Sequence, residues 1–355
     1  MSITTDKPRV VVADDSALMR CIVSNLLARG GMEVVGAAKD GDEALAMCER
    51  EQPDAMTLDL AMPGLGGIDV LRELRQRGGR QIPVVVVSAF SPAHGARAVD
   101  ALAEGAFELV PKPNGSGDVD AFEQNLLGKL RLATRIRRLR APWRRDSVPA
   151  PPPAGDPGGA AGRPAARDGV TRALLITTST GGPRALATLV PQLPAPLGLG
   201  TLIVQHMPAG FTASLAARLD RSSPLSVCEA QGGETVEPGV ALVAPGGRHL
   251  RLTADGHTCV SDEPPLGGLR PRADLLIEDA ARRWADRLTL VVLTGMGNDG
   301  LRGAEAVRRH GGRILVEAET TCTVYGMPRA IAEAQLADDV LPLDQMAAAI
   351  TAEVN

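Results

Sequence analysis

Residues 173–182 read ALLITTSTGG, an apolar run that ends in hydroxyl side chains and two glycines. The run predicts a buried strand, and the amphipathic stretch beyond the glycines predicts a helix. Ser179 therefore lies at the sharp turn between the two, where we expect its hydroxyl to be exposed. Similar patterns predict further strands in the same half of the chain at Thr201–Gln205, Thr289–Thr294 and Arg313–Val316.

Two other polar side chains lie where predicted strands end. His206 follows the strand at 201–205, and Asp299 lies in GMGNDG at 295–300, whose glycines let the backbone bend sharply. Because ligands bind outside the carboxyl ends of parallel strands, we expect Ser179, His206 and Asp299 to meet there. They would supply the nucleophile, base and orienting group of serine hydrolysis, whatever their order along the chain. Taken alone, His206 would be interpreted as a buried structural imidazole.

The composition of the 355 residues argues against several classes of protein. A formal net charge of −4 disfavours a protein built mainly to bind nucleic acid. No apolar run approaches the ~20 residues of a membrane span, and the polar N-terminal stretch lacks a signal-peptide core. We therefore expect a cytoplasmic protein without membrane insertion.

The cysteines and most histidines offer no metal-ligand spacing. The cysteines are scattered and odd in number, which favours reduced core thiols over disulfides or a zinc site; they are Cys21, Cys48, Cys228, Cys259 and Cys322. Surface or loop positions are expected for His94, His249, His257 and His310.

A proline-, glycine- and alanine-rich stretch divides the chain. Between residues 141 and 168 little apolar surface is available to offset the entropy of ordering, which predicts an extended linker. We therefore predict one domain at 1–127 and another at 171–355, with a basic helix end and the linker at 128–170. Within the second domain, short strand candidates from Val227 to Val260 predict hairpins inserted near one edge of a parallel sheet.

The first domain alternates short strands with helices, which predicts a five-stranded, doubly wound parallel sheet. The predicted strands are Arg9–Ala13, Val34–Ala38, Ala55–Asp59, Pro83–Ser88 and Phe107–Val110. The predicted helices are Ser16–Arg29, Asp42–Arg50, Ile68–Arg77, Gly95–Glu104 and one that begins near Val119.

Five polar residues fall at one edge of this predicted sheet: Asp14, Asp15, Asp59, Ser88 and Lys112. Three convergent carboxylates repel one another unless a cation lies among them, and oxygen ligands suit Mg²⁺. A carboxylate beside the metal can attack a phosphoryl group, whose oxygens the lysine and the serine hydroxyl can then bind. An Asp-Asp pair alone is more often a helix cap, but the combination favours a phosphorylation site.

Positions 8–127 resemble the receiver domain of two-component response regulators. The resemblance is carried by the aspartates, the serine and the segments DLAMP at 59–63 and VPKP at 110–113. The resemblance implies a flavodoxin-like fold, with Asp59 as phospho-acceptor. It implies Asp14, Asp15 and the Ala61 carbonyl as further Mg²⁺ ligands, Ser88 as the switch hydroxyl and Lys112 as the phosphate-sensing lysine. Leu109 departs from the family, which usually has an aromatic residue there.

Five segments of the second half resemble the catalytic domain of the chemotaxis protein-glutamate methylesterases: TSTGG at 178–182, QHMPAGF at 205–211, APGG at 244–247, LTGMGNDG at 293–300 and YGMPR at 325–329. The resemblance implies a Rossmann-like α/β domain in which Ser179, His206 and Asp299 act as nucleophile, base and orienter. The glycine-flanked amide of Met296 is the predicted oxyanion donor. Thr177-Thr178 departs from the usual Gly-Ala or Gly-Ser.

The resemblance also implies an activity and its partners. The activity is phosphorylation-activated demethylation of glutamate methyl esters, with glutamine deamidation, and no esterase cofactor. The substrate would be methyl-accepting chemotaxis receptors, and the phosphodonor a chemotaxis histidine kinase. Two alternatives stay open: a catalytically weak docking protein that keeps the fold, and a receiver-controlled transcription regulator. The second would need a basic helix-turn-helix module, which the strands of the second half do not suggest.

Overall fold

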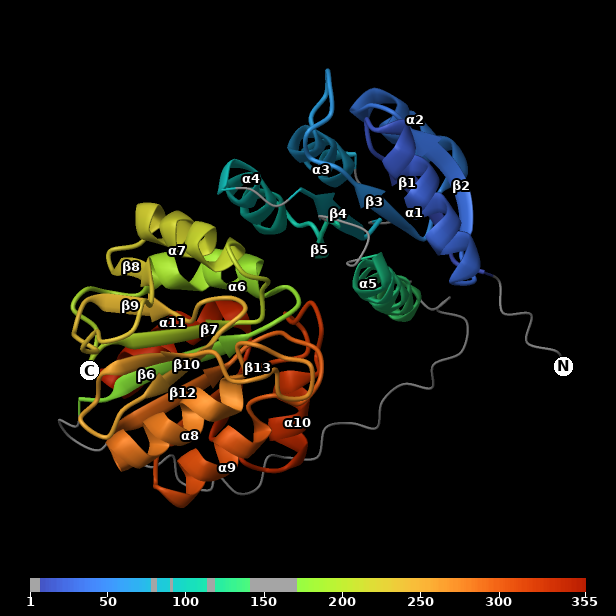
Figure 1. Ribbon diagram of the computed structural model, residues 1–355. Helices are drawn as coiled ribbons and strands as arrows, with labels where there is room; N and C mark the ends of the chain where they lie inside the picture. Colours follow the sequence, from blue (N-terminus) through green and yellow to red (C-terminus); the bar gives the residue numbers. More distant parts are fainter. Residues whose placement is uncertain (1–6, 78–81, 90–91, 114–118, 141–170) are drawn as a thin grey trace, which may run out of the picture.

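The fold is described from a computed structural model covering residues 7–77, 82–89, 92–113, 119–140 and 171–355 (Figure 1). The predicted linker at 141–168 lies outside the described residues. Two separate parallel sheets organise the chain, one before and one after that segment. Their cores are aliphatic, in keeping with an aromatic content of 2%.

The N-terminal sheet has five parallel strands in the order β2-β1-β3-β4-β5, which confirms the predicted doubly wound architecture. Its strands are β1 Arg9–Ala13, β2 Glu33–Ala38, β3 Ala55–Leu58, β4 Val84–Ser88 and β5 Glu108–Pro111. Its helices are α1 Ala17–Arg29, α2 Gly41–Glu51, α3 Gly67–Gln76, α4 Pro92–Ala103 and α5 Val119–Arg140. Short polar side chains start the first two helices, because the hydroxyl of Ser16 and the carboxylate of Asp40 each accept a first-turn amide.

The C-terminal sheet has seven parallel strands in the order β14-β13-β12-β6-β7-β9-β8. They are β6 Ala173–Thr178, β7 Thr201–Gln205, β8 Ser226–Glu229, β9 Val240–Val243, β12 Leu288–Val292, β13 Arg313–Glu317 and β14 Asp339–Leu341. A separate antiparallel pair consists of β10 His249–Leu252 and β11 Thr258–Ser261. The helices are α6 Gly182–Leu189, α7 Phe211–Ser222, α8 Ala273–Trp284, α9 Leu301–Arg309, α10 Met327–Glu333 and α11 Leu343–Val354, with short 3₁₀ segments η2 Val190–Gln192 and η3 Ala285–Arg287.

The segment from Val227 to Val260 holds one hairpin, β10–β11, as predicted. Its other strands differ from the expectation, because β8 and β9 join the main sheet in parallel beside β7. Helix α7 connects β7 to β8, whereas β8 and β9 are joined by residues 230–239 without a helix, so glycine and proline breaks alone do not distinguish this parallel pair from a hairpin. The edge strand β14 was also missed, since it is three residues long and mostly exposed.

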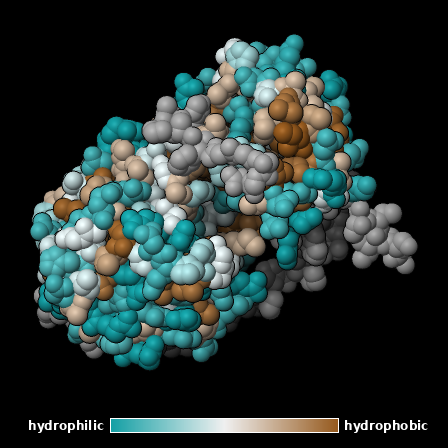
Figure 2. All heavy atoms as spheres, in the orientation of Figure 1, coloured by the Kyte–Doolittle hydropathy of each residue, from teal (hydrophilic) through white to brown (hydrophobic). Residues whose placement is uncertain are grey.

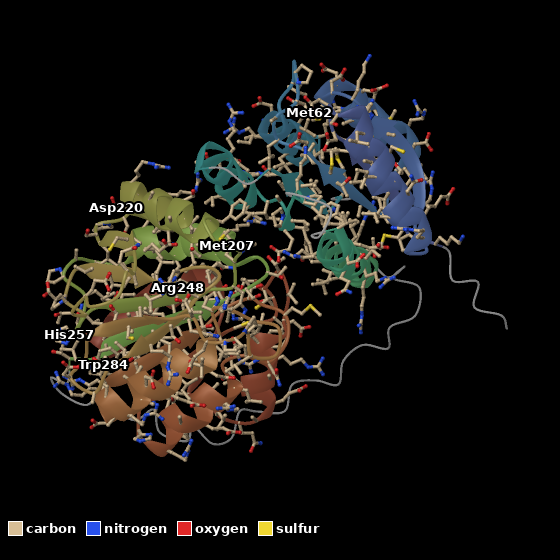
Figure 3. All side chains as sticks on the ribbon, viewed as in Figure 1. Met62, Met207, Asp220, Arg248, His257 and Trp284 are labelled. Atoms are coloured by element: carbon tan, nitrogen blue, oxygen red, sulfur yellow. The ribbon has the colours of Figure 1, made fainter. Side chains whose placement is uncertain are left out.

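Helix α4 of the N-terminal half packs on α6 and α7 of the C-terminal half (Figure 1). Apolar residues of both halves belong to one buried cluster. Asp100 on α4 pairs with Arg218 on α7, and the Thr180 hydroxyl donates to Glu108 Oε2 over 3.1 Å. The carboxyl ends of the second sheet face this contact: in Figure 3, Met207 lies on the side of the N-terminal half, whereas Trp284 lies at the far end.

The surface is mostly hydrophilic on the face drawn in Figure 2, with hydrophobic residues in separate patches. Among the described residues, no helix is both long and apolar enough to span a membrane. All five cysteines are free, as expected, but the prediction of core thiols is wrong for Cys21, Cys228 and Cys259, which are exposed. Two of these lie on short strands, where alternate residues face solvent.

Candidate functional site

Adjacent strands bring the predicted catalytic residues to one edge of the C-terminal sheet. Thr178 pairs with Gln205 in the β6–β7 register, so Ser179 and His206 follow side by side. On the other side, β12 pairs with β6, and the Ser179 amide donates to the Thr294 carbonyl over 3.0 Å. The glycine-rich segment after β12 therefore borders the Ser179 turn.

The turn at Ser179 depends on closely packed glycines. Gly181 has a φ of 82°, which favours glycine, and α6 begins at the next residue. A Cβ on Gly295 would lie 2.8 Å from the Ser179 Cβ, so only glycine lets the β12 loop approach the serine this closely. The sequence thus folds into a sharp strand-to-helix turn with Ser179 half-buried at its apex.

The imidazole of His206 is hydrogen-bonded to Asp299, with 2.7 Å between Nε2 and Oδ2. Both side chains are buried, at 8% and 1% exposure. The other ring nitrogen, Nδ1, is also buried and has no hydrogen-bond partner among the described residues. With Nε2 donating to the carboxylate, Nδ1 carries the lone pair of the neutral ring. The structure therefore joins His206 to Asp299 and places Ser179 at the next strand end, without a hydrogen bond between serine and histidine.

Asp299 accepts two backbone hydrogen bonds and forms an ion pair with an arginine in a buried setting. The amides of Ala273 and Asp274, at the start of α8, donate to it over 2.7 and 3.0 Å. Arg272 Nε lies 3.0 Å from its Oδ1. Burial acts to raise the pKa of Asp299, but the bond with His206 and the two amides outweigh burial and lower it to about 2. Asp299 is therefore an anion throughout the neutral range.

Sequence reasoning missed Arg272 and Asp274. The Asp274 carboxylate accepts the amides of Gly300 and Gly303 over 2.9 and 3.0 Å, which caps the start of α9. Arg272 Nη2 lies 2.7 Å from Asp274 Oδ2. Burial raises the pKa of Asp274, with the nearby charge of Asp299 adding to the rise and the bond with Arg272 opposing it. The available signal was the pattern Arg-Ala-Asp at 272–274, where α8 begins in the structure, and this pattern fits an ordinary helix cap equally well.

Met296 lies in the loop after β12, with its side chain 58% exposed. The segment is pinned to the next loop, since Gly295 bridges Tyr325 and the Gly326 amide donates to the Gly295 carbonyl. Within the described residues, no hydrogen bond uses the Met296 amide. The Met296 amide therefore lies in the loop whose Gly295 borders the Ser179 turn.

The two threonines before Ser179 are accommodated on opposite faces of β6. The Thr178 hydroxyl donates to the Thr294 carbonyl over 2.9 Å, and its side chain packs where Gly182 lacks a Cβ. Thr177 is fully buried, and its methyl lies 3.6 Å from the position that a Cβ on Gly300 would occupy. Gly182 thus provides the space that Thr178 requires, whereas Thr177 packs in the core at ordinary contact distance from the Gly300 position.

In the N-terminal sheet, Asp14, Asp15 and Asp59 place carboxylate oxygens within 4.8 Å of one another. Lys112 Nζ lies 2.8 Å from Asp14 Oδ2 and 2.9 Å from Asp59 Oδ2. Burial raises the pKa of Asp14, although the bond with Lys112 opposes the rise. Burial acts to lower the pKa of Lys112, but its bonds with the two aspartates outweigh burial and raise it. One lysine leaves most of the negative charge uncompensated, so the cluster suits a hard cation with oxygen ligands.

The other residues predicted for the phosphorylation site lie on or next to strands of the same sheet. Ser88 ends β4 and is fully buried, and its hydroxyl has no partner among the described residues. Its carbonyl accepts the Lys112 amide over 2.8 Å, which ties the serine to the lysine. Ala61 lies two residues beyond Asp59, half-buried in the loop before α3. Leu109 is 1% exposed in a core cluster, so this position packs as an aliphatic residue.

The other histidines bring no further chemistry to the site. His249 is fully buried, which corrects the expectation of a surface or loop position: its Nδ1 accepts the Arg272 amide over 3.1 Å and its Nε2 lies 3.2 Å from the Pro264 carbonyl. His257 pairs with Asp255 on the surface, and His310 bonds the Ala306 carbonyl at the end of α9. The side chain of His94 lies outside the described part.

The two sheets, the acidic cluster and the Ser-His-Asp edge define a class: a response regulator whose effector has the layout of a serine hydrolase. Residues 10–121 match the response regulator receiver domain, and residues 174–350 match the family described as CheB methylesterase. The chain belongs to the CheB methylesterase family.

Individual relatives agree along the whole chain. A protein of Symbiobacterium thermophilum named protein-glutamate methylesterase/protein-glutamine glutaminase is 41% identical, covering 100% of this chain and 99% of its own. A Myxococcus xanthus protein with the same description, numbered 5, is 40% identical over 98% of each chain. The crystal structure of the Thermotoga maritima CheB methylesterase catalytic domain is 40% identical and covers 51% of this chain and 97% of its own, with a TM-score of 0.50.

Proposed function

We propose that this chain hydrolyses glutamate γ-methyl esters on methyl-accepting chemotaxis receptors, with Ser179, His206 and Asp299 as its catalytic triad. The observation that carries the proposal is the buried 2.7 Å contact between His206 and Asp299, with Ser179 on the adjacent strand end. The family membership and the names of its relatives support the choice of ester. The same acyl chemistry would deamidate glutamine, with ammonia leaving in place of methanol.

In the proposed mechanism, His206 Nδ1 takes the proton of the Ser179 hydroxyl as the serine oxygen attacks the ester carbonyl. The Met296 amide donates to the oxyanion that develops. The bond to the methoxy oxygen then breaks, His206 returns its proton to that oxygen, and methanol leaves. Water repeats the sequence on the acyl-enzyme and releases the glutamate side chain. Asp299 stays ionised and stabilises the imidazolium through Nε2.

Phosphorylation at Asp59 would control this activity, with a chemotaxis histidine kinase as phosphodonor. Asp14, Asp15, Asp59 and the Ala61 carbonyl would hold Mg²⁺, consistent with three close carboxylates and a single bridging lysine. When bound, the ion neutralises phosphoryl and carboxylate oxygens. Lys112 and the Ser88 hydroxyl would bind the phosphoryl oxygens, and the unpartnered hydroxyl of Ser88 fits that role.

The receiver half, assigned to residues 1–127, would inhibit the effector half at 171–355 by lying against its catalytic edge. The hydrogen bond from Thr180 to Glu108 engages the residue next to the nucleophile, and α4 covers α6 and α7 nearby. A receptor helix needs this edge free to reach Ser179. Phosphorylation at Asp59 would shift the population towards an arrangement in which the halves have separated.

The test is methanol release from membranes that carry methylated receptors. S179A should abolish release and keep the fold, since it removes one oxygen from a half-buried turn. S222A is the matched control, because the Ser222 hydroxyl bonds only carbonyls of its own helix. Release near the wild-type rate in S179A would overturn the triad. No release from the phosphorylated wild-type chain would instead make this a docking protein.

A further inference from the structure

The geometry points to Arg272 as a positioning residue that fixes the orientation and charge of Asp299, an inference that rests on the proposed triad. Its guanidinium bridges two carboxylates: Nε lies 3.0 Å from Asp299 Oδ1, and Nη2 lies 2.7 Å from Asp274 Oδ2. The arginine side chain is 18% exposed, and both carboxylates are nearly fully buried. Charge-assisted bonds of this kind are stronger than bonds between neutral groups.

The two oxygens of the Asp299 carboxylate have different partners, which shows what the arginine contributes. Oδ2 accepts from His206 Nε2 and the Ala273 amide, whereas Oδ1 accepts the Asp274 amide and lies 3.0 Å from Arg272 Nε in an ion pair. The hydrogen bonds of Arg272 Nε and Nη2 go to Asp274 Oδ2, over 3.2 and 2.7 Å. The backbone donors are fixed by the start of α8. Within the described part, the guanidinium is the one cationic side chain paired with Oδ1, whereas the imidazole bonds Oδ2, so the two groups contact different oxygens of the carboxylate.

Arg272 also neutralises a repulsive pair. Asp299 and Asp274 are neighbouring buried carboxylates whose charges act on each other. The charged and titratable groups that face them are His206, Arg272 and, at longer range, Arg302, whose guanidinium is bonded to Glu278 on the surface. His249 touches this group only through the Arg272 backbone amide. Without the guanidinium, two buried anions would share one helix start.

The same bridge links two helices. Asp299 lies just before α9 and accepts amides from the start of α8, while Asp274 lies at the start of α8 and accepts amides from α9. Each carboxylate thus caps the helix of the other. The planar fork of arginine can bond both at once, whereas a lysine ammonium acts as a single point charge. Arg272 therefore sets the position of the loop 295–300 relative to α8.

R272M removes the charge and keeps much of the chain length. We expect kcat for methanol release by the unphosphorylated full chain to fall about tenfold, with KM little changed, because a displaced Asp299 orients His206 less well. We also expect the acid limb of the kcat profile to move up by about one pH unit, because losing a nearby cation favours proton uptake by the Asp299–His206 pair. R272K should keep the acid limb near that of the wild type while kcat falls severalfold.

R251M is the matched control. Arg251 also binds a buried carboxylate on α8, with Nε 2.6 Å from Asp279 Oδ2, but its ion pairs within the described part are with Asp279 and Glu263, not with Asp299 or Asp274. The R251M substitution should lower the midpoint of thermal unfolding without moving the acid limb of the kcat profile. An unshifted limb in a folded R272M, or the same shift in R251M, would overturn the positioning role. If R272M fails to fold, wild-type kcat in R272K would overturn it. Activity that survives S179A would instead refute the triad itself, whatever Arg272 does.

Discussion

A single glycine on α4 offers a direct test of inhibition by the receiver half. A Cβ on Gly95 would lie 3.0 Å from Ser214 Oγ and 3.6 Å from the Gly210 carbonyl, both in the effector half. G95L would add three more carbons to this already tight contact. The substitution should therefore push the two halves apart and raise the basal rate of methanol release without phosphorylation. Leucine has a higher helix propensity than glycine, by about 1 kcal/mol, so the substitution should not destabilise α4 itself.

The expected rise follows from the cost of overpacking. Extra methylenes in a packed contact cost about 1–3 kcal/mol, and a cost of ~2 kcal/mol changes the open-to-closed ratio about 30-fold. If the closed arrangement is populated to ~99%, the open share grows from ~1% to about a quarter, and basal activity rises about 20-fold. The polar contacts between the two halves are too weak to offset the cost of overpacking. The partly exposed ion pair between Asp100 and Arg218 stabilises the closed arrangement by at most about 1 kcal/mol.

The assay compares unphosphorylated wild type, G95L and G128L on methylated receptor membranes. Gly128 is the matched control, since it also lies in a receiver helix, α5, but a Cβ there meets nothing within 4 Å. G128L should keep the wild-type basal rate. The inhibition model is refuted if G95L is folded and its basal rate stays at that of the wild type, or if G128L is activated to the same extent.

Three further outcomes follow from the structure. D59N should abolish phosphoryl uptake from acetyl phosphate and the Mg²⁺-dependent activation, since an amide is neither nucleophile nor anionic ligand; full activation by the donor would place the switch elsewhere. T177G should keep kcat within about twofold of the wild-type value and lower the midpoint of thermal unfolding, because the Thr177 side chain fills a buried space beside β6. A clear gain in kcat would mean that the threonine crowds the site. The lowered pKa of Asp299 stabilises the fold above about pH 4, and this contribution is lost as the pH falls towards 2, through its folded pKa. D299N should therefore destabilise the effector half less at pH 3 than at pH 6, by about 1 kcal/mol, in thermal unfolding; an equal loss at both pH values would contradict the lowered pKa.

The positions of most strands along the chain were predictable, because short apolar runs bounded by glycines and polar residues are typical of buried strands. Ser179 and His206 were placed correctly at the carboxyl edge since each directly follows such a run, and Asp299 follows in the glycine-rich segment beyond the third. The parallel pairing of β8 and β9 was not predictable in this way, because their glycine and proline breaks fit a hairpin equally well. His249 likewise begins a short strand whose burial depends on what packs over it.

The sequence by itself determined two α/β halves, the acidic cluster around Asp59 and the three residues of the proposed triad, because each depends on local patterns at strand ends. Only the tertiary structure decided that His206 meets Asp299 through Nε2, that Arg272 bridges Asp299 and Asp274, and that α4 packs on α6 and α7. These contacts join segments that are separate along the chain, and their geometry depends on side-chain packing between elements. A periodic pattern reports which face of an element is buried, but not which partner buries it.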